Sequence, residues 1–159
     1  MPSVKDKPEL LLHICCAGCG VYTGQMLAED FDVTLYYYNP NIFPEDEYGL
    51  RRSEAENIAG RFGLRIISAP YDHRAWLNKV AGHEQDRERG ERCRICYSDR
   101  LRATAAEARR RGIASFATTL TTSPHKDAAL INRLGAEFAE EFGVGFLVLA
   151  DEKRSAPAA

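Results

Sequence analysis

The sequence predicts one α/β domain in which a mostly parallel sheet of about five strands lies between two layers of helices. Its 159 residues suffice for one hydrophobic core and leave little room for a second. Short apolar runs alternate with amphipathic stretches, and the connections between them are short. This alternation is typical of right-handed strand-helix-strand units. We expect residues 1–150 to form the domain and the polar, Ala-rich residues 151–159 to form a disordered tail.

The first half of the chain contains three expected strands. The apolar run Glu9 to Cys16 (ELLLHICC) is expected to be a buried strand, followed by a helix from Cys19 towards Glu29. Val33 to Tyr38 (VTLYYY) is rich in β-branched and aromatic residues and predicts a second strand. Leu64 to Ala69 predicts the third. Between the last two strands we expect a helix that begins near Pro44, with an apolar face made of Tyr48, Ala55, Ile58, Ala59 and Phe62.

The second half continues the alternation. A short helix near Arg74 to Val80 and a polar loop lead to a long helix that begins around Cys93. Ser115 to Thr119 predicts the fourth strand. The next helix is expected to begin with Ser123 as its cap and Pro124 at its first position, and Val144 to Leu149 predicts the fifth strand. That helix has apolar residues at four-residue spacing, namely Leu130, Leu134, Phe138 and Phe142.

The composition indicates an ordinary soluble protein. It has 45% hydrophobic and 28% charged residues, with a mean hydropathy of -0.36. Its apolar runs are too short to span a bilayer, and the charges at Lys5, Asp6 and Lys7 are unlike a secretory signal. We therefore expect a cytoplasmic protein that does not interact with a membrane.

The five cysteines are the most informative residues. They are Cys15, Cys16, Cys19, Cys93 and Cys96. Thiols are normally reduced in the cytosol, so their clustering indicates metal, redox or catalytic chemistry. Two CxxC pairs supply four thiolates to one metal centre, but the 73 residues between the pairs disfavour a compact zinc ribbon. We expect a site that the folded sheet assembles, in which positive helix ends stabilise the thiolates.

The fifth thiol leaves several interpretations open. It can complete a cluster, bind a second metal, act as a redox thiol, or simply fill the core as a small hydrophobe. Neighbouring residues on a strand face opposite ways, so Cys15 and Cys16 can share a pocket only if the strand is ending. A structural zinc site made of the other four thiols is an alternative.

Other unusual residues follow the expected strands. Ligands bind in such sheets beyond the carboxyl ends of the strands, where Asn39, Asn41, Tyr71 and Asp72 are expected. Ser123 to Asp127, which includes His125 and Lys126, is either an anion site at a helix start or an ordinary capped helix. His13 is expected to be a hydrogen-bonded core histidine, and Trp76 to pack under its short helix.

Charge is distributed unevenly along the chain. The net charge is -2, but the segment from Arg87 to Arg111 contains nine arginines and four acids. A polyanion could dock on such a face, although a solvated arginine-rich helix that binds nothing explains the pattern equally well.

Several spaced motifs together resemble the QueH-type epoxyqueuosine reductases along nearly the whole chain. The motifs are LLLHICCAGC at Leu10 to Cys19, YYYNPNIFPEDEYGLR at Tyr36 to Arg51, PYD at Pro70 to Asp72, RCRICYSDRL at Arg92 to Leu101 and TTLTTSPHKD at Thr118 to Asp127. The resemblance implies a Rossmann-like fold of the nucleotide α-hydrolase group. It also implies reductive removal of the epoxide oxygen from epoxyqueuosine at the tRNA wobble position, which is the last step of queuosine synthesis.

The resemblance also implies cofactors, partners and residue roles. The five cysteines would hold a [4Fe-4S] cluster and a nearby mononuclear iron, and an unidentified donor would supply electrons. Asp72 and His125 are the candidate proton donors. The remaining substrate-edge residues would be Asn39, Asn41, Tyr71, Ser123, Lys126 and Asp127. Arg109, Arg110 and Arg111 become candidates for contacts with tRNA phosphates.

The sequence departs from the family pattern in two places. Gly18 stands where members usually have Pro, and members continue past the fifth strand into a Cys-Gly-Cys element that these 159 residues do not include. The second departure raises the alternative of a truncated, inactive member.

Two other classes are alternatives. One is a non-catalytic RNA-binding module with structural zinc. The other is an ATP-using sulfur transferase or pyrophosphatase, which is disfavoured because cysteines replace the Ser-Gly-Gly-type phosphate loop expected after the first strand.

Overall fold

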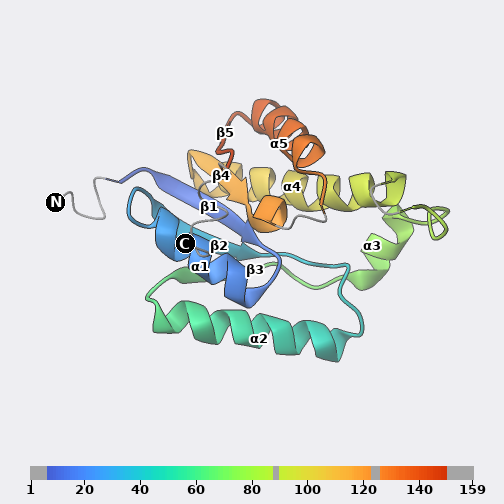
Figure 1. The fold of residues 1–159 in the computed structure, drawn as a ribbon, viewed down its shortest axis with the longest axis horizontal. Helices are drawn as coiled ribbons and strands as arrows, with labels where there is room; N and C mark the ends of the chain where they lie inside the picture. Colours follow the sequence, from blue (N-terminus) through green and yellow to red (C-terminus); the bar gives the residue numbers. More distant parts are fainter. Residues whose placement is uncertain (1–6, 88–89, 123–125, 150–159) are drawn as a thin grey trace.

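Five parallel strands form the centre of the protein, as the alternating pattern predicts (Figure 1). The computed structural model describes residues 7–87, 90–122 and 126–149. The sheet has the strand order β3-β2-β1-β4-β5. Its strands are β1 (Glu9–Ile14), β2 (Asp32–Tyr37), β3 (Arg65–Ser68), β4 (Ser115–Thr118) and β5 (Gly145–Phe146). The Rossmann-like, three-layer α/β class is therefore confirmed.

Two pairs of helices cover the two faces of this sheet (Figure 1). Helices α1 (Ala17–Leu27) and α2 (Glu45–Arg61) pack together on one face. Helices α4 (Glu91–Arg111) and α5 (Ala128–Phe142) pack together on the other. The short helix α3 (His73–Lys79) lies beside the start of α4, and a 3-10 helix, η2 (Thr119–Thr122), follows β4.

Alternation along the strands divides the core between these faces. Leu10, Leu12 and Ile14 of β1 contact the layer of α1 and α2, whereas Leu11 contacts the layer of α4 and α5. All four are fully buried. A strand buried on both faces needs apolar residues at consecutive positions, which explains the continuous apolar run in the sequence.

The strand order reverses beside β1. Residues of β1 pair with β2 on one side and with β4 on the other, for example Ile14 with Tyr37 and His13 with Thr118. The chain builds β1, β2 and β3 outward in one direction and then crosses to build β4 and β5 in the other. The loops after β1 and β4 therefore diverge at their carboxyl ends, where open α/β sheets bind ligands.

Some local predictions are wrong. Helix α5 begins at Ala128 with Asp127 as its cap, whose carboxylate accepts a hydrogen bond from the Leu130 N–H at 3.1 Å. Ser123 and Pro124, expected to begin this helix, lie outside the described residues. Asp127 is the cap because its carboxylate accepts a hydrogen bond from an N–H of the first turn.

Two apolar segments also differ from expectation. Phe62 is 51% exposed because α2 ends at Arg61, which leaves Phe62 outside the buried face. Strand β5 has only two residues, Gly145 and Phe146, which pair with Ser115 and Phe116 of β4, so most of the expected Val144 to Leu149 is not strand. The tail expected at 151–159 lies outside the described residues. Within the described ranges, no helix has the length and apolar character needed to cross a membrane.

Candidate functional site

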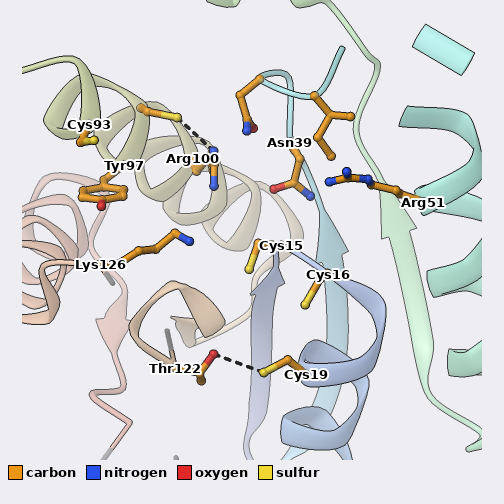
Figure 2. Close-up of a pocket in the computed structure, with 13 residues that line it drawn as sticks. Cys15, Cys16, Cys19, Asn39, Arg51, Cys93, Tyr97, Arg100, Thr122 and Lys126 are labelled. Carbon is orange, nitrogen blue, oxygen red and sulfur yellow. Dashed lines mark hydrogen bonds between the residues drawn. The ribbon is translucent and has the colours of Figure 1, made fainter. Parts of the chain in front are cut away.

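A pocket of about 570 Å³ lies at the carboxyl edge of the sheet, where the strand order reverses (Figure 2). All five cysteines line it, so the folded sheet brings together thiols that are far apart in the sequence. The described residues around the pocket are Cys15, Cys16, Cys19, Asn39, Asn41, Ile42, Arg51, Cys93, Cys96, Tyr97, Arg100, Thr122 and Lys126.

The end of β1 and the start of α1 supply three of the thiols. Strand β1 ends at Ile14, so Cys15 and Cys16 are released from the alternation of the strand and both line the pocket. Cys16 is the cap residue of α1, and Cys19 follows in its first turn. The thiol of Cys19 lies 3.4 Å from the Thr122 hydroxyl, and the thiol of Cys15 lies 3.7 Å from that of Thr119.

Helix α4 supplies the other two thiols from its N-terminal end. Cys93, Cys96, Tyr97 and Arg100 follow the spacing i, i+3, i+4, i+7, which places them on one face of the helix. Helical periodicity therefore brings the two thiols of this CxxC pair to the same face. The same spacing identifies Tyr97 and Arg100, which sequence reasoning missed.

The thiols occupy different walls of the pocket, with Cys93 of α4 across from Cys15 at the end of β1 (Figure 2). Over the described ranges, no three Cys, His, Asp or Glu side chains converge closely enough to hold a metal ion. A single zinc ion needs all its ligands around one point. A cluster of four irons and four sulfides is broader and takes four thiolates, so this donor set fits a cluster better than it fits one ion.

Electrostatics in the pocket favour a thiolate beside β1. A hydrogen bond from the Cys16 thiol lowers the pKa of Cys15 to about 5, although burial opposes this change. The Thr119 hydroxyl and the charges of Arg100 and Lys126 act in the same direction as the bond. Donating that hydrogen bond raises the pKa of Cys16. Cys15 therefore loses its proton easily, whereas Cys16 keeps its own.

Arg100 is the buried cation of the site. It is 6% exposed, and its Nη2 donates to the Cys96 sulfur at 3.0 Å, as drawn in Figure 2. Its Nε has no hydrogen-bond partner among the described residues. No carboxylate is among the described residues that line the pocket, whereas Arg51, Arg100 and Lys126 all line it. The site therefore carries a positive field.

The loop after β2 forms another wall. Asn39 is 2% exposed, and its Nδ2 donates to the Ile14 carbonyl at 3.0 Å, which ties the ends of β1 and β2 together. The side-chain oxygens of Asn39 and Asn41 have no partner at bonding distance in the described part of the chain. Arg51 of α2, which the sequence did not single out, points towards this wall and is held by Glu47 at 2.9 Å. This wall therefore contains a cation and two buried amide oxygens without partners among the described residues.

His13 is the hydrogen-bonded core residue that we expected. It is fully buried, with Nδ1 3.0 Å from the Thr118 hydroxyl and Nε2 3.1 Å from the Tyr38 carbonyl. Burial, helped by the charge of Arg100, lowers the pKa of His13 to about 3. The neutral ring therefore connects β4 to the residue after β2 across β1, near the end of β1 that leads to Cys15.

Tyr71 and Asp72 lie outside the pocket, contrary to their expected place at the substrate edge. The Tyr71 hydroxyl donates to the Ile42 carbonyl at 2.5 Å and its ring stacks on Tyr48. Asp72 is exposed and caps α3, accepting from the Ala75 N–H at 3.0 Å. Asp72 therefore caps a helix and Tyr71 holds the loop that carries Asn41, while the proton-donor role of Asp72 stays a prediction.

Lys126 and Asp127, which precede α5, line different hollows. Lys126 lines the pocket, as expected of a substrate-edge residue. Asp127 caps α5 and lines a separate hollow with Arg94 and Arg133. Ser123 and His125 lie outside the described residues, so their expected roles stay predictions.

Arg109, Arg110 and Arg111 lie in the last turn of α4, at the opposite end from the thiols. At 1.5 Å per residue, Arg110 is roughly 20 Å along the helix from Cys96. Arg110 and Arg111 both form ion pairs with Glu107. The structure thus separates the arginine cluster from the pocket, and its contact with tRNA stays a prediction.

The fold is similar to a solved structure from Methanocaldococcus jannaschii, described as a predicted subunit of tRNA methyltransferase. The TM-score is 0.62 with 12% sequence identity, and the alignment covers 94% of this chain and 75% of the other. At this identity the likeness shows the fold alone.

Sequence comparison gives much closer matches. A protein from Streptococcus pyogenes named epoxyqueuosine reductase QueH is 35% identical over 89% of this chain and 58% of its own length. Proteins of the same name from Haemophilus influenzae and Thermotoga maritima are 38% and 36% identical, over 61% and 71% of their own lengths. The chain therefore spans about three fifths of the first two relatives. A family model for epoxyqueuosine reductase QueH matches residues 10–156. This chain belongs to the epoxyqueuosine reductase QueH family.

Proposed function

We propose that this chain provides the metal-binding catalytic domain of an epoxyqueuosine reductase. In the proposed reaction two electrons and two protons convert epoxyqueuosine at the wobble position of tRNA to queuosine, and the epoxide oxygen leaves as water. The observation that carries the proposal is the convergence of five thiols on one pocket at the reversal point of the sheet. Membership of the QueH family gives that pocket its proposed chemistry.

Four of the five thiolates would hold a [4Fe-4S] cluster, and the remaining thiol would bind an additional iron. When bound, these groups would supply electrons and a Lewis acid for the epoxide oxygen. The positive field of Arg100 and Lys126 supports thiolate ligands, and the exposure of Cys16, Cys19 and Arg51 shows that the pocket is accessible to solvent. The structural-zinc module is not favoured, because it needs a closed four-ligand site rather than five thiols spread around a cavity.

The other pocket residues would bind and orient the modified base. A pocket of about 570 Å³ is large enough for one nucleobase and its substituent but not for a duplex. The base would therefore enter from single-stranded RNA, as in other enzymes that act on an extruded base. Asn39 and Asn41 would accept hydrogen bonds from it through their unpartnered side-chain oxygens. Arg51 and Lys126, on different walls of the pocket, would meet the flanking phosphates.

The test is a direct assay. Protein reconstituted without oxygen is mixed with epoxyqueuosine-containing tRNA and a dithionite-reduced viologen, a one-electron donor that replaces the unidentified partner. Digestion and mass spectrometry then report queuosine, which lacks one oxygen atom. We expect conversion by wild-type protein and none by Cys96→Ser. A cluster-loaded wild-type protein that binds this tRNA but leaves the epoxide intact would overturn the proposed reaction.

A further inference from the structure

Arg100 occupies an unusual position for an arginine. It lies one turn after Cys96 on the face of α4 that lines the pocket, and it is 6% exposed. Its Nη2 donates to the Cys96 sulfur at 3.0 Å, while its Nε is buried without a partner among the described residues. No ion pair joins Arg100 to a carboxylate in the part of the chain that the structure describes.

A buried guanidinium is costly unless an anion compensates its charge. Taking a cation out of water costs several kcal/mol after relaxation, and this cost is normally offset by a paired carboxylate. The nearest acid in the sequence, Asp99, instead contacts Lys79 and the hydroxyl of Tyr38. Arg100 contacts the Cys96 sulfur, and its charge also acts on Cys15 and on the neutral His13. The compensating anion therefore has to lie in the pocket.

We propose that Arg100 is the positioning residue and counter-charge of the thiolate-bound metal centre. Its guanidinium would hold the Cys96 sulfur in place and favour the more negative, reduced state of the centre. This inference rests on the proposed function, because it requires that the thiols hold an anionic cluster. Hydrogen bonds to cluster sulfurs and nearby charge are known determinants of reduction potential.

The first test is the reduction potential of the loaded protein. We compare Arg100→Met, which removes the charge and the donor, with Arg100→Lys, which keeps the charge. Arg102→Met is the matched control, because Arg102 lies on the same helix but is exposed and pairs with Glu141 at 2.7 Å. Arg100→Met is expected to lower the equilibrium constant for reduction of the centre at least tenfold, which lowers the reduction potential by about 59 mV for one electron. Arg100→Lys should recover most of this loss and Arg102→Met should match wild type.

The second test separates this role from a merely structural one. Unfolding by urea is measured for each protein with and without its metal centre. Without metal, Arg100→Met should be as stable as wild type or more stable, because it removes a buried charge that has no carboxylate partner among the described residues. With metal, the same variant should gain less stability than wild type does. A structural arginine would instead lower stability equally in both states.

Each outcome is decisive. An Arg100→Met protein with an unchanged potential, or with an equal loss of stability in both states, overturns the inference. If Arg100→Lys takes up the metal centre and Arg100→Met does not, the inference is supported, because lysine keeps the positive charge and methionine removes it. A wild-type protein that takes up no cluster refutes the metal centre itself and so the proposed function, whereas an effect missing only at Arg100 refutes this inference alone.

Discussion

The two edges of the sheet both contain arginines, but the arginines differ in their partners. At the amino edge a hollow of about 210 Å³ is lined by Arg65 and Arg111, and each has a carboxylate partner. Arg65 pairs with Asp32 at 2.8 Å and Arg111 with Glu107. At the carboxyl edge Arg100 is buried with no carboxylate in the described lining of its pocket.

This difference teaches where to look for a ligand. Exposed arginines that pair with nearby acids already have their charge balanced, and each pair stabilises the fold only slightly. Such arginines indicate a solvated surface. A buried cation and buried amide oxygens that have no partner in the described part of the chain mark a place where a bound ligand can supply the missing partners. The density of arginine in the sequence therefore says less about function than the burial of one of them.

The largest expected effect concerns the thiols of α4. Cys93→Ser or Cys96→Ser should abolish metal loading, because serine does not replace a thiolate cluster ligand, while the sheet stays folded. Iron and sulfide analysis and circular dichroism check this. Arg94→Gln, a change at an exposed residue between the two cysteines, is the control and should load normally. Full metal retention in both serine variants would contradict the assignment.

The second prediction uses the buried histidine of β1. The pKa of His13 is lowered from 6.5 to about 3, so the unfolded chain binds more protons between these values. Its contribution to stability is complete above about pH 6.5 and is lost as the pH falls towards 3. In urea unfolding of the metal-free chain, wild type should lose up to about 1.4 kcal/mol per pH unit more than His13→Gln in this window. Parallel pH profiles would show that His13 does not titrate on unfolding.

The third prediction concerns the wall of the pocket. Asn39→Ala removes the donor to the Ile14 carbonyl, and leaving that buried acceptor unsatisfied should cost about 1–3 kcal/mol of unfolding free energy. Asn57→Ala on the exposed surface of α2 is the control and should change stability by less than about 0.5 kcal/mol. Equal stabilities of the two variants would show that Asn39 does not tie the strand ends.

The smallest effect concerns RNA and compares the two edges directly. Lys126→Gln should reduce the slope of log affinity against log salt by about 1, if Lys126 contacts one phosphate. Arg110→Gln and Arg111→Gln should change the slope less, because Glu107 already pairs with both residues. Titration of tRNA at several salt concentrations measures this. The reverse order would place the main RNA contact at the far end of α4, as the charge pattern alone suggested.

The sequence predicted the fold well because burial on both faces leaves a strong pattern. The apolar run before Cys15 and the apolar residues of α5 located elements whose ends were then correct to within a few residues. Helix starts were harder, since Ser123 and Asp127 are both good caps and only the structure selects Asp127.

The site was predicted in part. The thiols were found because cysteine clusters are rare, and Asn39, Asn41 and Lys126 were found because they follow strands. Arg100 was missed because it is one of nine arginines in its segment, and only its spacing from Cys93 distinguishes it. Asp72 caps α3 and is not among the described residues that line the pocket, since a polar residue after a strand can equally cap the next helix.

The most direct test of the central claim is the metal content of protein reconstituted without oxygen. Iron, zinc and acid-labile sulfide are measured together with an absorption spectrum. About four irons and four sulfides per chain, or additional iron, is the result that we predict. Stoichiometric zinc without sulfide, or no bound metal, would contradict a thiolate-bound iron-sulfur centre in this pocket.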